Sequence, residues 1–365
     1  MKIVLLGDLH IGVKGSSDVM MYHQQRFFDF LFEYLKQNNI STIIQLGDIW
    51  DNRRQANYKS LDFAYNKLFD RLKSNNINMF GVLGNHDIFY RENLDINSSQ
   101  LLLREFDNVK IFDQCTTLNF DGLKIDFIPW ICAQNKQQCI DYISNTSSKV
   151  CVGHFEINDF PVLANSLFQG GMVPEQFTRY SYVFSGHFHS ASRKVVNGVN
   201  IDYVGTPYQL TWNDAKPFKN NQNWQCNHFV VIDTEDVANY RYVQYNNQFF
   251  HYIQYDDVNK STTDIENLDL SNCYVKVVIV NKSKPLKYNN FISSVFQKQP
   301  ADVKFIDQQL LNPQTSNKLS AEVKDTSELI KQYVDNTDYT DSDKVLLKNY
   351  LIKIYNQCLS ESNNL

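Results

Sequence analysis

The chain has 365 residues, of which 43% are hydrophobic and 14% aromatic, so it can bury a large core in one main domain with smaller attachments. Its net charge of −5, from 35 Lys and Arg against 40 Asp and Glu, excludes a protein that holds nucleic acid by bulk positive charge alone. The seven cysteines are odd in number and form no Cys-x-x-Cys pair, which favours a reducing cytoplasm over a disulfide framework or a zinc ribbon. No apolar run approaches membrane-spanning length and the short apolar start does not fit a signal peptide, so we expect an intracellular protein without membrane contact.

The first quarter of the chain predicts a parallel α/β sheet. Apolar runs at residues 2–6, 42–46 and 79–83 are typical of buried strands, and apolar residues at helical spacing lie between them at 20–38 and 58–74. Strands that alternate with helices in this way run parallel, and their functional edge lies at the carboxyl ends of the strands.

The middle of the chain predicts further strands. Short alternating strands are expected over 109–130, a helix over 135–144, and strands at 149–152 and 182–184, followed by a hairpin over 195–204 that turns at Asn197-Gly198. We expect residues 227–233, 240–244 and 249–254 to complete a second sheet.

The last third predicts smaller attachments. The composition becomes polar past Asp256, and residues 274–280, 288–296 and 303–306 are typical of a strand-helix-strand unit. A linker is expected near 312–320, followed by helical patterns at 329–334 and 345–359, the second with an apolar stripe.

Acids, amides and histidines follow five of the predicted strands, where each strand gives way to a loop. They are Asp8 and His10, Asp48 and Asp51, Asn85 and His86, His154, and His187 and His189. The ends of parallel strands meet at one edge of a sheet, so we expect a metal site assembled from these loops. Oxygen and imidazole donors without a thiolate suit Mn²⁺ or Fe²⁺, can hold Zn²⁺ and are poor for Cu⁺.

We expect two ions roughly 3.5–4 Å apart, which would hold phosphoester oxygens and acidify an attacking water. One ion is assigned to Asp8, His10, Asp48 and His189, and the other to Asp48, Asn85, His154 and His187. His86 is not needed as a ligand. We expect it to stabilise the phosphorus centre or to protonate the departing oxygen, with Asp51 orienting its ring.

The order of these motifs resembles the calcineurin-like metallophosphoesterases. Asp-x-His, Gly-Asp-x-x-Asp, Gly-Asn-His-Asp, Gly-His and Gly-His-x-His follow one another from Asp8 to His189. Within that superfamily the chain is similar to the SbcD-type DNA repair and recombination nucleases, especially phage small subunits, at residues 6–12, 128–130 and 203–211 and in its two-helix tail. The plentiful Asn, Lys and Ile also fit the AT-rich genome of a phage.

The resemblance implies an αββα four-layer sandwich at residues 1–256, a small α/β capping domain at 257–311, a linker at 312–319 and C-terminal helices at 320–365. It implies an Mn²⁺-dependent DNA nuclease, both exonuclease and endonuclease, that acts in DNA recombination and double-strand-break repair. The cap would shape DNA access and the C-terminal helices would dock on the coiled coil of an SbcC-type ATPase, with a homodimer inside a heterotetramer. Such an enzyme works in the cytoplasm, that of the host for a phage protein.

Other interpretations stay open at this point. A phosphatase or cyclic-nucleotide phosphodiesterase would use the same ions, although Asn52-Arg53-Arg54 after Asp51 departs from the Arg-Gly of the protein phosphatases. An inactive adaptor should lack a metal ligand, and none of the seven is missing. The stripe in the last helix is equally compatible with packing and with a partner surface.

Some residues have simpler explanations. A single Asp or His at a strand end is ordinarily explained by a loop hydrogen bond, and only the ordered set favours metal. We expect Asp87 to cap its loop and His23, His228 and His251 to be structural or surface residues. Solvent exposure accounts for most of the basic residues that could meet DNA phosphates, namely Arg53, Arg54, Arg193, Lys194, Lys282, Lys284 and Lys287.

Overall fold

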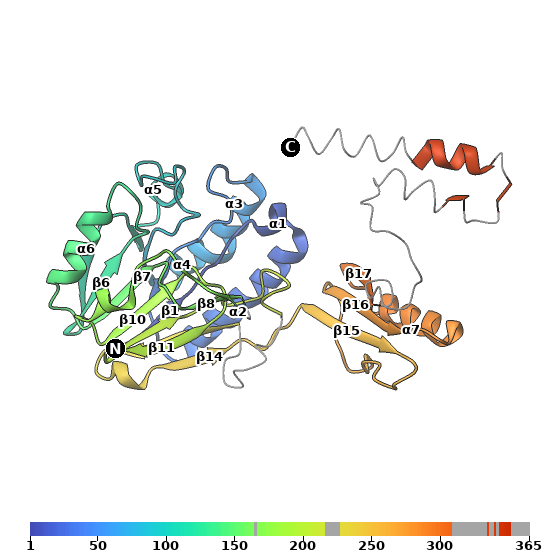
Figure 1. Ribbon diagram of the computed structural model, residues 1–365. Helices are drawn as coiled ribbons and strands as arrows, with labels where there is room; N and C mark the ends of the chain where they lie inside the picture. The colour runs from blue at the N-terminus through green and yellow to red at the C-terminus, as the bar shows by residue number, and fades with distance from the viewer. Residues whose placement is uncertain (164–165, 216–226, 309–333, 336–338, 341–342, 352–365) are drawn as a thin grey trace. The chain divides into compact units, whose positions relative to one another are not determined.

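The computed structural model describes the chain except residues 164–165, 216–226, 309–333, 336–338, 341–342 and 352–365 (Figure 1). Contacts divide the chain into two compact units, Met1–Gln309 and Leu310–Leu365. In the second unit, residues 343–351 are helical. The remaining parts of the predicted tail helices, 329–333 and 352–359, lie outside the described residues. None of the described helices is long and apolar enough to cross a membrane.

Six strands form the first sheet of the Met1–Gln309 unit, in the order β14-β13-β1-β2-β3-β4. They are β1 Lys2–Leu6, β2 Thr42–Gln45, β3 Asn78–Val82, β4 Val109–Phe112, β13 His228–Asp233 and β14 Arg241–Gln244. Strands β1 to β4 run parallel, as the alternation of strands and helices predicts. The prediction that β13 and β14 belong to a second sheet is wrong, because β13 pairs antiparallel with β1 and β14 pairs with β13.

The helices of this half lie between the parallel strands in sequence. They are α1 Val13–Ser16, α2 Asp18–Gln37, α3 Tyr58–Ala64 with a π-helical turn at Tyr65–Phe69, α4 Asp70–Ser74 and α5 Ser98–Leu102. The predicted helices at 20–38 and 58–74 are confirmed.

A second six-stranded sheet has the order β11-β12-β10-β7-β6-β5. Its strands are β5 Thr116–Phe120, β6 Leu123–Ile128, β7 Val150–His154, β10 Tyr182–Gly186, β11 Ser192–Val196 and β12 Val199–Tyr203. The predicted hairpin at 195–204 is confirmed as the antiparallel pair β11 and β12. Shorter elements complete this part of the chain: α6 Lys136–Asn145, β8 Pro161–Leu163, β9 Ser166–Leu167 and the 3-10 helices Pro174–Phe177 and Val237–Asn239.

The two sheets pack face to face and are covered by helices on their outer faces. Successive strand residues point to opposite faces, so in β1 Ile3 and Leu5 join Phe127 and Val152 of the second sheet in one core. Val4 and Leu6 of β1 instead pack in a second core that contains Phe27, Phe28 and Leu31 of α2. On the far side of the second sheet, Cys151 and Val183 pack with Cys139 and Ile143 of α6. The αββα sandwich is therefore confirmed.

A small third sheet follows the sandwich in sequence. Strands β15 Phe250–Asp256, β16 Tyr274–Asn281 and β17 Asp302–Asp307 run parallel, and α7 Pro285–Gln297 connects the last two. The predicted strand-helix-strand unit is confirmed. The assignment of residues 249–254 to the second sheet is wrong, because β15 pairs with β16, and the small sheet thus begins before residue 257.

Candidate metal centre

Loops from both sheets bring the predicted residues together. Asp8 and His10 follow β1, Asp48 follows β2, Asn85 follows β3, and His154 ends β7. His187 and His189 follow β10, which lies next to β7 in the second sheet. His10, Asp48 and His187 have positive φ angles of 43°, 57° and 86°, a conformation that L residues rarely adopt and that clusters at functional sites.

The first group of donor atoms comes from Asp8, His10 and His189. Their donor atoms lie within 4.8 Å of one another, and the Nε2 atoms of the two histidines are 3.1 Å apart. Asp8 Oδ2 is 3.9 Å from each of these nitrogens. Asp8 and His10 are buried, whereas the side chain of His189 is 33% exposed, so the group opens to solvent on the His189 side.

The second group comes from Asn85, His154 and His187. Asn85 Oδ1 lies 3.0 Å from His154 Nε2 and 3.0 Å from His187 Nδ1. Asp48 completes this group, since its donor oxygen and the donor nitrogens of the two histidines lie within 4.8 Å of one another.

Asp48 lies between the two groups. Its Oδ2 atom is 3.3 Å from His154 Nε2 in the second group and 3.7 Å from His10 Nε2 in the first. Asp48 Oδ1 accepts a hydrogen bond of 2.7 Å from the backbone N–H of His86, which fixes the carboxylate. One oxygen of Asp48 therefore faces both groups, as a bridging ligand must.

The cluster has an excess of negative charge that attracts protons. Burial lowers the pKa of His10, but the carboxylates of Asp51, Asp48 and Asp8 raise it more, to about 9. Burial likewise lowers the pKa of His154, and the charges of Asp48 and Asp8 raise it to about 9. Divalent cations would supply the same positive charge, so the donor set fits metal ions in chemistry as well as in geometry.

Each of three histidines has its second ring nitrogen close to an oxygen. His154 Nδ1 donates to the carbonyl of Leu46 at 2.7 Å, His187 Nε2 lies 3.3 Å from Glu156 Oε1, and His10 Nδ1 lies 3.4 Å from Asp51 Oδ1. The hydrogen bond of His154 holds the proton on its outer nitrogen and directs the other nitrogen inward, and the carboxylates near His10 and His187 favour the same orientation by their charge. Neither Glu156 nor its role was predicted, although its position two residues after His154 in the sequence was a usable signal.

Asp87 holds the loop of Asp48 rather than facing the donor groups. Its carboxylate accepts hydrogen bonds from the backbone N–H groups of Asp48, Ile49, Trp50 and Gly84. The prediction that Asp87 caps the loop is confirmed.

Two glycines allow the loops to approach closely. A Cβ on Gly84 would lie 2.2 Å from Asp48 Oδ1, and one on Gly186 would lie 2.6 Å from Asp8 Oδ1. Any larger residue at either position would displace a carboxylate of the cluster.

His86 lies beside the first group. Its ring is edge-on to that of His10, with centroids 4.8 Å apart. Its Nδ1 donates to the backbone carbonyl of Asp51. Asp51 therefore contacts the ring of His86, but through its main chain, while its carboxylate faces His10. The remaining histidines, His23, His228 and His251, are buried within the packing.

Comparison with known proteins defines the class. The model of the calcineurin-like phosphoesterases matches residues 1–191. The chain belongs to this family, whose members hydrolyse phosphoester bonds. It is also similar to exonuclease subunit 1 of Enterobacteria phage T4, with 32% identity over 357 residues that cover 97% of this chain and 98% of the phage protein.

Solved structures are more distant. GAP50, described as the anchor in the inner membrane complex of Plasmodium, is 12% identical with a TM-score of 0.42, covering 68% of this chain and 90% of GAP50. Phosphopantetheinyl hydrolase from Mycobacterium tuberculosis is 14% identical with a TM-score of 0.33, covering 60% and 93%.

Proposed function

We propose that the chain is a DNA nuclease that hydrolyses phosphodiester bonds with two Mn²⁺ ions, and that it acts in recombination and double-strand-break repair with an SbcC-type ATPase. The observation that carries the proposal is the pair of donor groups that face one oxygen of Asp48. The choice of DNA rests on the identity of 32%, along nearly the whole chain, to a phage protein named as an exonuclease subunit.

The proposed ligand sets follow the two groups. Asp8, His10, Asp48 and His189 would hold one ion, and Asp48, Asn85, His154 and His187 the other. Carboxylate, amide and imidazole donors without a thiolate fit Mn²⁺. Two bound divalent ions polarise phosphoryl oxygens and lower the pKa of water.

His86 is proposed as the catalytic residue beside these ligands. Its backbone N–H binds Asp48 and its ring Nδ1 binds the carbonyl of Asp51, so both ends of the residue are fixed relative to the donor groups. With Nδ1 as the donor, Nε2 is the atom left to bind a phosphoryl oxygen or to exchange a proton with the departing oxygen. Asp51 acts as a positioning residue, for His86 by its carbonyl and for His10 by its carboxylate.

The small sheet is proposed as the cap that shapes DNA access. It is joined to the sandwich by the 2.9 Å hydrogen bond from His23 Nε2 of α2 to the carbonyl of Asn272, and by the contact of Ser17 Oγ with the hydroxyl of Tyr274 at 3.1 Å. Phe250 and Cys273 also pack in the core that contains α2.

The helix at residues 343–351 is proposed to bind the ATPase. Its apolar residues Val345, Leu346 and Tyr350 are 57%, 69% and 64% exposed, which is typical of a partner surface. A homodimer within a heterotetramer is proposed from the family resemblance.

A substrate panel tests the proposal. With Mn²⁺, the purified chain should cleave single-stranded and duplex DNA, and EDTA should stop the cleavage. The same preparation should leave phosphopeptides and cyclic nucleotides intact. Hydrolysis of either of these, with DNA untouched, would replace the nuclease assignment by one of its rivals.

A further inference from the structure

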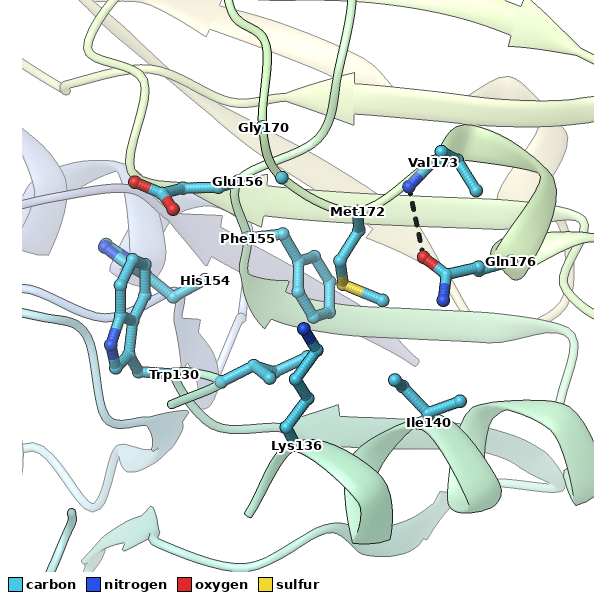
Figure 2. A pocket seen from close by; sticks show the side chains of 12 residues that line it. Trp130, Lys136, Ile140, His154, Phe155, Glu156, Gly170, Met172, Val173 and Gln176 are labelled. Carbon is cyan, nitrogen blue, oxygen red and sulfur yellow. Dashed lines mark hydrogen bonds between the residues drawn. The ribbon is translucent and has the colours of Figure 1, made fainter. Parts of the chain in front are cut away.

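A cavity of about 380 Å³ opens beside the second donor group (Figure 2). One wall is formed by Lys136 and Ile140 of α6, and the opposite wall by the segment from Gly170 to Gln176. Phe155 lies between these walls in Figure 2, and the side chain of Met172 reaches toward its ring from the second wall. This volume lies within the usual range for small-molecule sites, roughly 300–1,000 Å³.

The cavity adjoins the donor groups directly. His154 belongs both to the second group and to the lining of the cavity. The indole of Trp130, which also lines the cavity, has its ring centroid 5.8 Å from that of His154 and 5.2 Å from that of His187. A phosphodiester held at the donor groups would therefore have its neighbouring nucleoside within reach of the cavity.

The lining suits a flat group with polar edges. Trp130, Ile140, Met172 and Phe155 supply aromatic and aliphatic surface, while Lys136 and Glu156 supply one charge of each sign. A single cation opposed by a carboxylate does not suit a second phosphate group. Gln176 accepts a hydrogen bond from the N–H of Val173 through Oε1 at 3.1 Å, and this fixes the orientation of its amide. Its Nε2 is then the end that can donate to a base edge.

We propose that this cavity binds an unpaired nucleobase next to the phosphodiester that is cleaved. The inference rests on the proposed nuclease function, and it adds that the substrate is unpaired next to the cleaved bond. A base within a duplex is stacked and paired and cannot enter a cavity, whereas a base in a single strand or at a frayed end can. Base binding to aromatic side chains contributes a factor of roughly 5 to 150 per base.

Filling the cavity tests the proposal on the full chain. In Ile140→Trp the larger side chain occupies the cavity from α6, away from the donor groups. The rate on a single-stranded oligonucleotide, divided by the rate on bis(p-nitrophenyl) phosphate, should fall roughly tenfold or more relative to the unmodified protein. The small diester has no nucleobase, and any contact of its nitrophenyl rings with the cavity would only make the measured fall in the ratio smaller. Gln138→Trp, on the exposed part of the same helix, is the matched control and should leave the ratio unchanged.

An abasic substrate gives a second readout that does not depend on the variant folding normally. A series of oligonucleotides should each carry one tetrahydrofuran abasic nucleotide, at a different position in each. At a single position next to the cleaved bond, loss of the base should lower the cleavage rate of the unmodified protein. At that position the abasic substrate should not slow Ile140→Trp further, because both changes remove the same contact.

Two outcomes would contradict the proposal, and they distinguish failure of the base site from failure of the nuclease function. Equal cleavage of abasic and intact strands at every position, with both substrates hydrolysed, would exclude the base site and leave the nuclease function standing. Failure of the unmodified protein to hydrolyse either substrate with Mn²⁺ would remove the proposed function, and the base site with it.

Discussion

At the scale of single residues, the ligands and the proposed catalytic residue should respond differently to removal. His86→Ala leaves all seven proposed ligands in place, so Mn²⁺ content should be kept while DNA cleavage falls by about 10²–10⁴-fold, the usual contribution of a general acid or base. Asp48→Ala removes the oxygen that faces both groups, so the protein should lose Mn²⁺. Elemental analysis after gel filtration, together with cleavage rates, measures both effects. Full activity of His86→Ala, or normal metal content of Asp48→Ala, would refute the corresponding role.

A substitution of Glu156 tests whether the oxygens near the outer ring nitrogens of the histidines support metal binding. Its carboxylate lies 3.3 Å from His187 Nε2, and partners of this kind typically change metal affinity by about 10–100-fold. Glu156→Gln should therefore weaken Mn²⁺ binding by a factor in that range, measured by isothermal titration. Glu175→Gln, an exposed acid in the same region, serves as the control. Equal affinities for the two variants would show that the contact does not support the site.

The proposed metal ligands could be predicted from the sequence more completely than the residues that contact and orient them. Ligands for metal ions are of a few residue types, so the proposed ligands Asp8, Asp48 and the histidines can be found by pattern at the strand ends. Glu156 lies two residues after His154 and Trp130 lies in a stretch that resembles the family, but their contacts with the histidines depend on the packing of β7 against its neighbours, so their roles do not follow from the local sequence. Asp51 was predicted to orient the ring of His86, and it contacts this ring through its backbone carbonyl, a detail that the sequence does not specify.

At the scale of elements, α2 and the small sheet are joined by a histidine that must stay neutral. The ring of His23 stacks on Phe249, with centroids 4.0 Å apart, and binds the carbonyl of Asn272. Burial lowers the pKa of His23 from 6.5 to about 4, although the bond to Asn272 acts in the opposite direction. Between these values the unfolded chain binds a proton that the folded chain does not, so stability must fall as the pH falls from about 7 to 4.

A variant isolates this pH dependence. His23→Gln keeps an amide hydrogen for the Asn272 carbonyl but cannot titrate. Between pH 7 and 5 the unmodified protein should lose about 2 kcal/mol more free energy of unfolding than the variant. Urea unfolding at the two pH values measures the difference, and the other titrating groups cancel because both proteins share them. Parallel losses in the two proteins would show that His23 is not the cause.

The positions of helices and strands were predicted better than the pairing of strands within the sheets. The helices and parallel strands of the first half could be predicted because each of them shows its own spacing of apolar residues in the local sequence. The placement of β13 was missed because it pairs with β1 across more than half of the sequence, a contact that leaves no local pattern. The sheets are also joined by Asp202 of β12, whose Oδ2 accepts bonds of 2.6 and 2.5 Å from the hydroxyls of Tyr240 and Tyr242. Such long-range pairs appear only in the folded chain.

At the scale of the whole molecule, the net charge favours a partner that strengthens DNA binding. A net charge of −5 repels DNA at a distance, and phosphate contacts normally supply most of the affinity for nucleic acid. Bound divalent ions neutralise the charge only within the site. A partner that contributes positive surface would therefore raise DNA affinity, and the exposed apolar side chains of the helix at 343–351 are where we expect it to bind.

Charge placed on the exposed apolar face of that helix should prevent binding of the partner to the full chain. Leu346→Asp combined with Tyr350→Asp places charge on the two apolar side chains that are 69% and 64% exposed. Binding to the ATPase should weaken by 100-fold or more, because a buried unpaired charge costs about 3–5 kcal/mol. Hydrolysis of bis(p-nitrophenyl) phosphate should be unchanged, since the helix lies outside the Met1–Gln309 unit that holds the donor groups. Asn349→Asp adds charge at an exposed polar position of the same helix and should leave co-purification intact. Co-purification of the double variant at the level of this control would assign the partner to another surface.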